Sequence, residues 1–145
     1  MSDNICVNLW KPISSIPYEV FDVNSIVFKG NTLSISLCDD GYDYYFVFDE
    51  LITNYGSYKY TTAMHNLELN DKLKEWYEQC GIIGKTYPLL ILHSSDYLES
   101  TKKQTYYAFT DDYKELKHYV FITYDAMIEV VSCKEPICKK ERKKE

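Results

Sequence analysis

The sequence LKHYVFITYDAMIEVVSCKEP, residues 116–136, contains two runs of strand-forming residues. Residues 119–122 are all aromatic or β-branched, and the pattern resumes at residues 127–131. Asp125 and Ala126 interrupt the pattern between the two runs. Aromatic and β-branched residues fit the pleated surface of a sheet, and two such runs so close together are typical of a tight β-hairpin. We predict that this hairpin belongs to the core and carries no chemistry of its own.

Upstream of the hairpin, two turn signals divide a β-rich segment into strands. The sequence GNT at 30–32 separates the runs 26–29 and 33–38, and DDGYD at 39–43 precedes the run 44–48. In the run 33–38 apolar residues alternate with serines, which is typical of a strand with one buried face. Short turns between consecutive strands favour an antiparallel meander over a crossover fold.

The sequence predicts one main helix at residues 71–80. Asn70 is a favourable N-cap, and Gly81 suits the C-terminal end of the helix. Four residues share one face of this helix, which we expect to pack on the sheet: Leu73, Trp76, Tyr77 and Cys80. With further extended segments at 53–63 and 87–93, the predicted fold class is α+β. It has a single, largely antiparallel β-sheet of about six strands and one main α-helix packed on one face.

A second helix start is predicted in SSDYLES, residues 94–100. Serine is one of the residues preferred at the N-cap, because its hydroxyl oxygen accepts a hydrogen bond from the first helical turn. Either Ser94 or Ser95 could cap one short helical turn here.

The chain has 145 residues and is 46% hydrophobic, which fits one domain with a real core. Its net charge is −6, but the last seven residues, KKERKKE, carry five positive and two negative charges. We predict a globular domain at residues 1–138 and a charged, disordered tail at 139–145. An acidic body is poorly suited to direct nucleic-acid binding. It suits a basic partner, or simply keeps the protein in solution.

The five cysteines have scattered spacings and include no CxxC motif. The first 20 residues lack the pattern of a secretory signal, and no apolar run is long enough to cross a membrane. These features predict a soluble cytoplasmic protein with reduced thiols. A zinc site with Cys133, Cys138 and a histidine is conceivable, but the spacing is weak evidence, and we expect no metal or cofactor.

Recognisable catalytic motifs are missing from the sequence. It has no GxSxG and no glycine-rich phosphate loop, so we expect no enzymatic activity. His118 begins a predicted strand, and we interpret it as a hydrogen-bonded histidine at the edge of the core. The alternative is a metal-dependent hydrolase that uses carboxylates around Asp111.

Acidic and aromatic residues occur together in two segments, which we predict to be partner-binding. The residues are Asp39, Asp40, Tyr42, Asp43 and Tyr44 in the first segment, and Asp111, Asp112 and Tyr113 in the second. Tyrosine offers a large contact area with few rotors to freeze, and neighbouring carboxylates attract lysine and arginine of a partner. The alternative is that these residues only reflect acidic turns and aromatic strands, as in many small sheets.

The order of several short motifs resembles a family of small acidic bacterial proteins found beside contact-dependent and polymorphic toxin genes. The motifs are WKP at 10–12, LSISL at 33–37, SYKY at 57–60, WYEQCG at 76–81, HSSDYL at 93–98 and the ending LKHY…IEVVS…EP. The resemblance implies a non-enzymatic immunity protein that binds a cognate toxin in the cytoplasm and occludes its active site. A basic toxin domain, for example a nuclease, would suit the acidic body. The alternatives are an inhibitor of a host or phage defence protein, and a homodimer formed through a tyrosine-rich strand edge.

Overall fold

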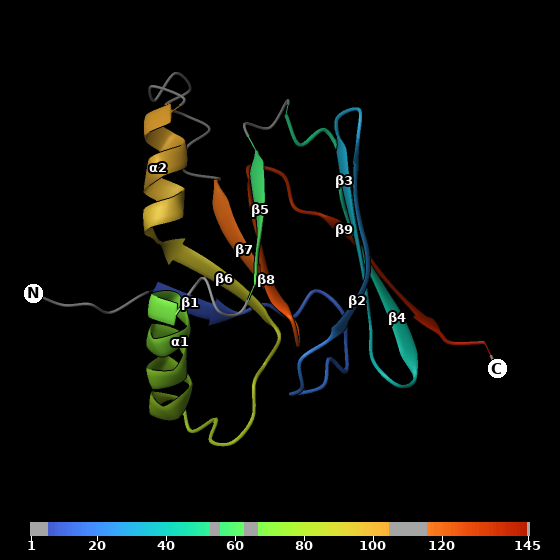
Figure 1. Ribbon diagram of the computed structural model, residues 1–145, viewed down its shortest axis with the longest axis vertical. Coiled ribbons are helices and arrows are strands. Elements are labelled where there is room, and N and C mark those ends of the chain that lie inside the picture. Colours follow the sequence, from blue (N-terminus) through green and yellow to red (C-terminus); the bar gives the residue numbers. More distant parts are fainter. Residues whose placement is uncertain (1–5, 53–55, 63–66, 105–115, 145) are drawn as a thin grey trace, which may run out of the picture.

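The computed structural model describes residues 6–52, 56–62, 67–104 and 116–144. This part of the chain contains nine strands and two helices (Figure 1). In chain order they are β1 (Cys6–Leu9), β2 (Asp22–Lys29), β3 (Thr32–Cys38), β4 (Tyr42–Phe48), β5 (Ser57–Thr62), α1 (Leu67–Gln79), β6 (Leu89–Ser94), α2 (Asp96–Gln104), β7 (Lys117–Ile122), β8 (Ala126–Ser132) and β9 (Ile137–Arg142).

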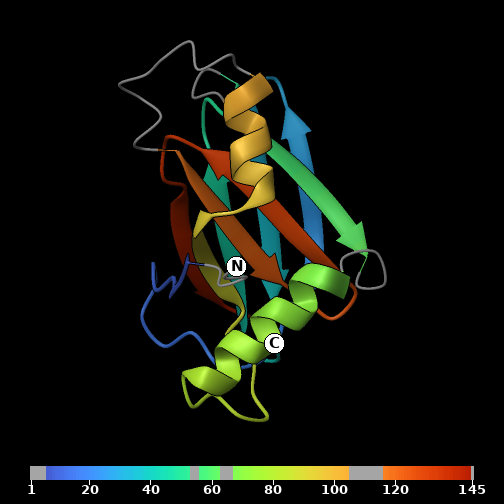
Figure 2. The ribbon, with the colours of Figure 1, turned by 90° about the vertical axis from the view of Figure 1, so that its left-hand side faces the viewer.

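The strands form two antiparallel sheets, with strand orders β1-β6-β7-β8-β5 and β2-β3-β4-β9. The sheets face each other, and both helices lie on the outer side of the five-stranded sheet (Figures 1 and 2). The described chain therefore has three layers: helices, a five-stranded sheet and a four-stranded sheet. No described helix is long and apolar enough to cross a membrane.

The predicted single sheet of about six strands with one main helix is wrong. The predicted meander exists as β2-β3-β4, and the predicted hairpin exists as β7-β8, but they belong to different sheets. The buried face of the meander packs against the hairpin and not against a helix. Ring centroids of Phe46 and Phe121 are 5.0 Å apart, and those of Phe48 and Tyr119 are 5.3 Å apart.

The hairpin β7-β8 is the middle layer, because it is buried on both of its faces. Tyr119 and Phe121 point towards the four-stranded sheet, where Trp10 also packs against both rings. On the opposite face, His118 contacts the ring of Tyr97 from α2. Aromatic residues thus fill the space between the sheets, and they fix the distance at which the layers pack.

The C-terminal segment also differs from the prediction. Residues 139–142, expected to be disordered, belong to β9 and pair with β4 at the edge of the four-stranded sheet. The ammonium of Lys140 lies 4.1 Å from the ring centroid of Tyr42 and 5.6 Å from that of Tyr44. Backbone pairing and these cation–π contacts attach the basic segment to the acidic domain.

Helix α1 confirms most of its prediction. Leu73 and Tyr77 are buried and Trp76 is partly buried, but Cys80 is exposed. The helix begins before Asn70, so the predicted N-cap is wrong. Gly81 has a φ of 80°, which is the left-handed conformation that commonly ends a helix, as predicted.

Candidate functional site

The first predicted binding segment forms the turn between β3 and β4. Asp39 shapes this turn: one carboxylate oxygen accepts hydrogen bonds from the backbone N–H of Gly41 (2.9 Å) and Tyr42 (2.8 Å). The other oxygen accepts a 2.7 Å hydrogen bond from the hydroxyl of Tyr44. Burial raises the pKa of Asp39, but these hydrogen bonds and the charge of Lys140 outweigh it and hold the pKa below the usual value.

Most members of this segment therefore already have partners within the protein. Tyr44 is buried, and Asp43 accepts a 3.1 Å hydrogen bond from the side-chain amide of Asn24. Asp40 and Tyr42 are exposed. The other three predicted residues, Asp111, Asp112 and Tyr113, lie outside the described residues.

Basic residues of β9 and of the segment after it lie beside this turn. Lys140 covers one face of the Tyr42 ring, and the N–H of Lys143 donates a 2.9 Å hydrogen bond to the carbonyl of Gly41. Lys140 therefore offsets part of the negative charge of the turn. The turn alone attracts a basic partner less than its sequence suggested.

The turn is one part of a larger surface at one end of the sandwich. Tyr124, in the β7-β8 turn, donates its N–H to the carbonyl of Phe21, whose ring packs on Tyr44 at 4.7 Å. These contacts bring three turn segments together. We define the end surface by eight exposed acidic or apolar residues of these segments and of the loop after α1: Tyr18, Glu19, Asp22, Asp40, Tyr42, Ile83, Tyr124 and Asp125. Lys85 of the same loop is exposed as well.

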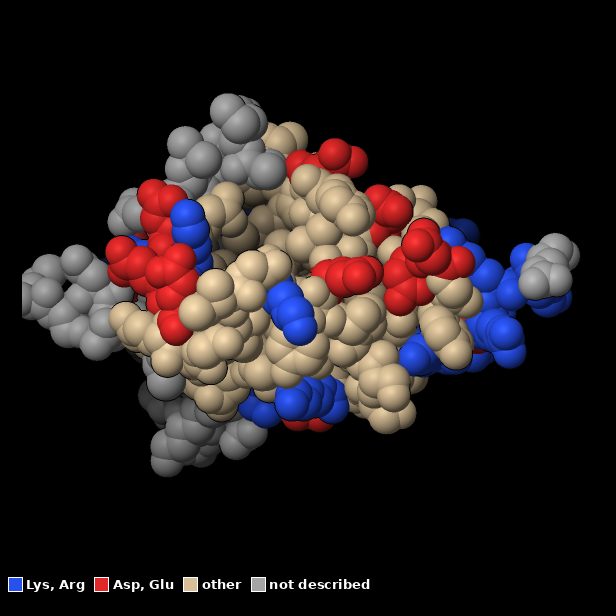
Figure 3. Space-filling view, turned by 90° about the horizontal axis from the view of Figure 1, so that it is seen from below, with Lys and Arg blue, Asp and Glu red and all other residues tan. Residues whose placement is uncertain are grey.

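Large apolar side chains are exposed in this region. Ile83 is 75% exposed and Tyr124 is 66% exposed. Figure 3 views the molecule from this end, and it shows separate groups of acidic side chains on either side of a mainly uncharged surface that also carries lysine or arginine side chains. The acidic groups lie over the helix side and towards the C-terminal side, where lysine and arginine also gather.

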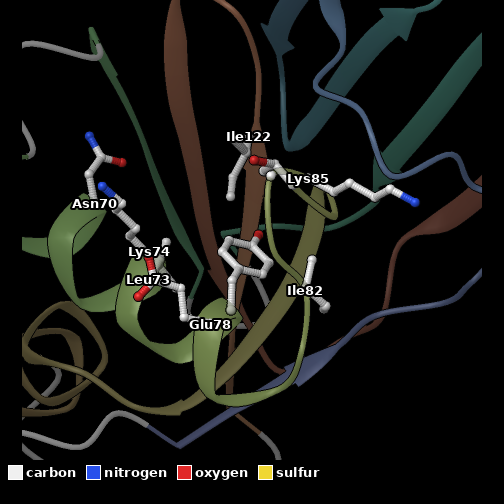
Figure 4. A pocket seen from close by; sticks show the side chains of 10 residues that line it. Asn70, Leu73, Lys74, Glu78, Ile82, Lys85 and Ile122 are labelled. Carbon is white, nitrogen blue, oxygen red and sulfur yellow. The ribbon is translucent and has the colours of Figure 1, made fainter.

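A pocket of about 340 Å³ opens beside α1 (Figure 4). Its lining residues are Asn70, Leu73, Lys74, Tyr77, Glu78, Ile82, Gly84, Lys85, Thr86 and Ile122. Leu73, Ile82 and Ile122 supply apolar surface, while the side chain of Lys85 extends away from the centre of the pocket. The size lies within the range of small-ligand pockets. The hydroxyl of Tyr77 already donates to the carbonyl of Tyr87 at 2.6 Å, so the pocket offers mainly apolar contact.

A buried chain of polar side chains links α2 to the five-stranded sheet. The Ser95 hydroxyl lies 2.7 Å from Nδ1 of His118, and Nε2 of His118 lies 2.9 Å from Oε1 of Glu129. Oε2 of Glu129 forms a 3.5 Å ion pair with Lys59. Oγ of Ser95 also accepts the N–H of Leu98 and so caps α2. A carboxylate only accepts hydrogen bonds, so His118 donates its Nε2–H to Glu129.

A serine, a histidine and a glutamate in a row also occur in acyl-transfer enzymes. In this protein His118 and Glu129 are each only 1% exposed, and Oγ of Ser95 accepts the capping N–H of Leu98. The arrangement is therefore explained as support for α2. The interpretation of His118 as a hydrogen-bonded core histidine is confirmed. The hydrogen bonds of His118 to Ser95 and Glu129 were not predicted from the sequence. A glutamate within an apolar strand was the signal that this carboxylate needs a buried partner.

No group of three potential metal ligands comes together among the residues that the structure describes. Comparisons of the chain with protein-family models, curated proteins and solved structures find no match. The resemblance to immunity-like proteins therefore stays a prediction.

Proposed function

We propose that this protein is a binding protein that neutralises a basic toxin domain by covering its active site. The observation that best supports this proposal is the end surface, where exposed aromatic and aliphatic side chains lie among exposed carboxylates. Aromatic side chains make large contacts at the centre of interfaces, and carboxylates around them pair with lysine and arginine.

Electrostatic attraction would bring the partner to this surface. The chain carries a net charge of −6, which favours encounter with a positively charged surface and disfavours acidic proteins. The end surface is formed by turns that two packed sheets hold in place. Little conformational entropy would then be lost on binding, which favours a tight complex.

The first experiment identifies the partner. The tagged protein is expressed at native level in its own host, and co-purifying proteins are identified by mass spectrometry. A stoichiometric toxin domain is the expected result, and binding and inhibition are then repeated with the purified pair. A defence protein in its place would keep the binding role and change the target. A chain that inhibits no purified partner would refute the proposal.

The second experiment locates the surface. One variant removes three carboxylates of the end surface and keeps the shape of each side chain: Asp22→Asn, Asp40→Asn and Asp125→Asn. A control variant makes the same change in net charge towards the opposite end of the sandwich: Glu50→Gln, Glu99→Gln and Glu135→Gln.

The end-surface variant should associate about tenfold more slowly at low salt, with a weaker salt dependence, because it loses local steering charge. The control should change the association rate much less, since its charges are distant from the interface. Equal effects in the two variants would mean that net charge alone matters and that the end surface is not the binding site.

A further inference from the structure

Each sheet ends in two outer strands, and an exposed strand edge can pair with another chain unless something blocks it. Three of the four outer strands in the described chain are protected. Strand β9 is protected by its charged residues, KKER at 139–142. Strand β2 has a register shift between Val23 and Ser25. Strand β1 has only four residues, with a further shift at its start.

The fourth outer strand, β5, lacks these protections. It pairs with β8 in regular register over all six residues of SYKYTT, and it contains no proline. Its only charged residue is Lys59. That ammonium lies 3.5 Å from Glu129 and 4.5 Å from the ring centroid of Tyr97. Lys59 is thus drawn onto the helix-covered face of the sheet and paired there, so it does not guard the open edge.

Aromatic side chains flank the open edge on the opposite face. Tyr58 is 38% exposed and Tyr60 is 49% exposed, although both point towards the space between the sheets. Phe28 of β2 contacts Tyr58 at 5.5 Å and is itself 39% exposed. Strand β5 is the outermost strand on its side of the molecule (Figure 2).

We propose that β5 pairs with β5 of a second copy of this chain. The pairing would be antiparallel about a twofold axis, and it would join two five-stranded sheets into one continuous sheet. The charge distribution favours a second copy over the basic partner of the end surface, because β5 itself carries no carboxylate. Lys59, the single lysine of β5, is paired with Glu129 of its own chain. The two β5 strands therefore bring little like-charge repulsion to the contact.

The sequence of β5 is compatible with this symmetry. In an antiparallel pair, residues directly opposite each other share a face and interact. A register with Tyr60 opposite Tyr60 places Tyr58 opposite Thr62, and Lys59 opposite Thr61. This register brings aromatic residues together and places no like charges opposite each other. The end surface stays free, so the dimer is independent of the proposed function.

The test is the molecular mass of the full chain in solution, measured by sedimentation from about 5 to 200 μM, a range in which dimers of ordinary strength dissociate. The expected result is a species of twice the 17.1 kDa chain mass at the upper concentrations. Tyr60→Lys should raise the dimer dissociation constant about tenfold or more, because it places two lysines opposite each other. Thr62→Lys is a second variant at an exposed position of the same strand.

Tyr124→Lys is the matched control, since Tyr124 is more exposed than Tyr60 and lies in the β7-β8 turn. It should dimerise like the parent. A parent that remains monomeric over the whole range overturns the proposal. A dimer that persists unchanged in both β5 variants overturns it as well. Neither result bears on toxin binding through the end surface.

Discussion

Replacing Ser95 with alanine should destabilise the protein by far more than the loss of one surface hydroxyl would suggest. Oγ of Ser95 serves two groups at once: it accepts the N–H of Leu98 at 3.1 Å and lies 2.7 Å from Nδ1 of His118. Alanine removes the helix cap and leaves a buried ring nitrogen without its hydrogen bond. The loss of stability therefore includes both the helix cap and the unsatisfied ring nitrogen.

The expected loss follows from these two contacts. Replacing an N-cap serine with alanine costs about 1 kcal/mol. Leaving a buried polar group without a partner costs about 1–3 kcal/mol, so the total is about 2–4 kcal/mol. A change of tautomer cannot recover this cost. It would leave an N–H at Nδ1 without an acceptor, and it would turn a lone pair of His118 towards the carboxylate of Glu129.

The assay is urea unfolding at 25 °C, followed by far-UV circular dichroism. The midpoint should fall while the slope with urea concentration stays constant, because the surface exposed on unfolding is unchanged. Ser94→Ala is the matched control, because Ser94 is the exposed neighbour of Ser95. This substitution should change the free energy of unfolding by no more than about 0.5 kcal/mol. If Ser95→Ala costs as little as the control, Ser95 does not bridge α2 and His118.

A double-mutant cycle separates the two contributions. Combining Ser95→Ala with His118→Phe removes both hydrogen-bonding partners, so the cost of the unsatisfied nitrogen disappears. We expect a coupling free energy of about 1–2 kcal/mol between the two positions. A coupling of zero would assign the whole effect of Ser95 to the helix cap.

Two further predictions concern the tyrosines and the β3-β4 turn. Tyr119→Phe should stabilise the protein by about 1 kcal/mol in urea unfolding, because the buried Tyr119 hydroxyl has no hydrogen-bond partner in the described chain. Tyr44→Phe deletes a hydroxyl that is hydrogen-bonded to Asp39, so it should destabilise the protein. If Tyr119→Phe were the less stable of the two variants, the hydrogen-bonding states of the two hydroxyls would be assigned wrongly. Asp39→Asn should cost about 1 kcal/mol at pH 7, since a carboxylate whose pKa is lowered on folding stabilises the protein above its unfolded pKa. That difference from the parent should shrink as the pH falls from about 5 through the folded-state pKa, and a constant difference would show that charge is not the cause.

Local sequence predicted several elements well. The hairpin, the meander, the main helix and its end at Gly81 are all present, because turn residues and apolar periodicity act over a few neighbouring residues. The prediction failed at the level of layers. Residues 119–122 and 127–131 have apolar residues on both faces of each strand, which is typical of a strand covered on two sides. That signal indicated a layer on each side of the hairpin, but the predicted fold placed only a helix against the sheet.

The candidate site was predicted only in part. Composition identified acidic turns with aromatic neighbours, and the β3-β4 turn does lie at the end surface. The sequence did not reveal that Asp39 and Tyr44 are used to build the turn. The predicted binding residues also did not include Tyr124 or Ile83, because the exposure of these side chains depends on how distant segments pack.

The amino-acid sequence by itself determined the strands of the meander and the hairpin, the turns between them and the end of α1, because propensities and turn residues are local properties of the chain. Only the tertiary structure decided which strands share a sheet. The backbone hydrogen bonds that join β9 to β4 are the same in kind as those that would join it to any other strand. The tertiary structure also placed Ser95 beside His118 and Glu129, and Lys140 over Tyr42. These contacts join residues far apart in the chain, and they form only when burial of the whole core offsets the entropy of closing the intervening loops.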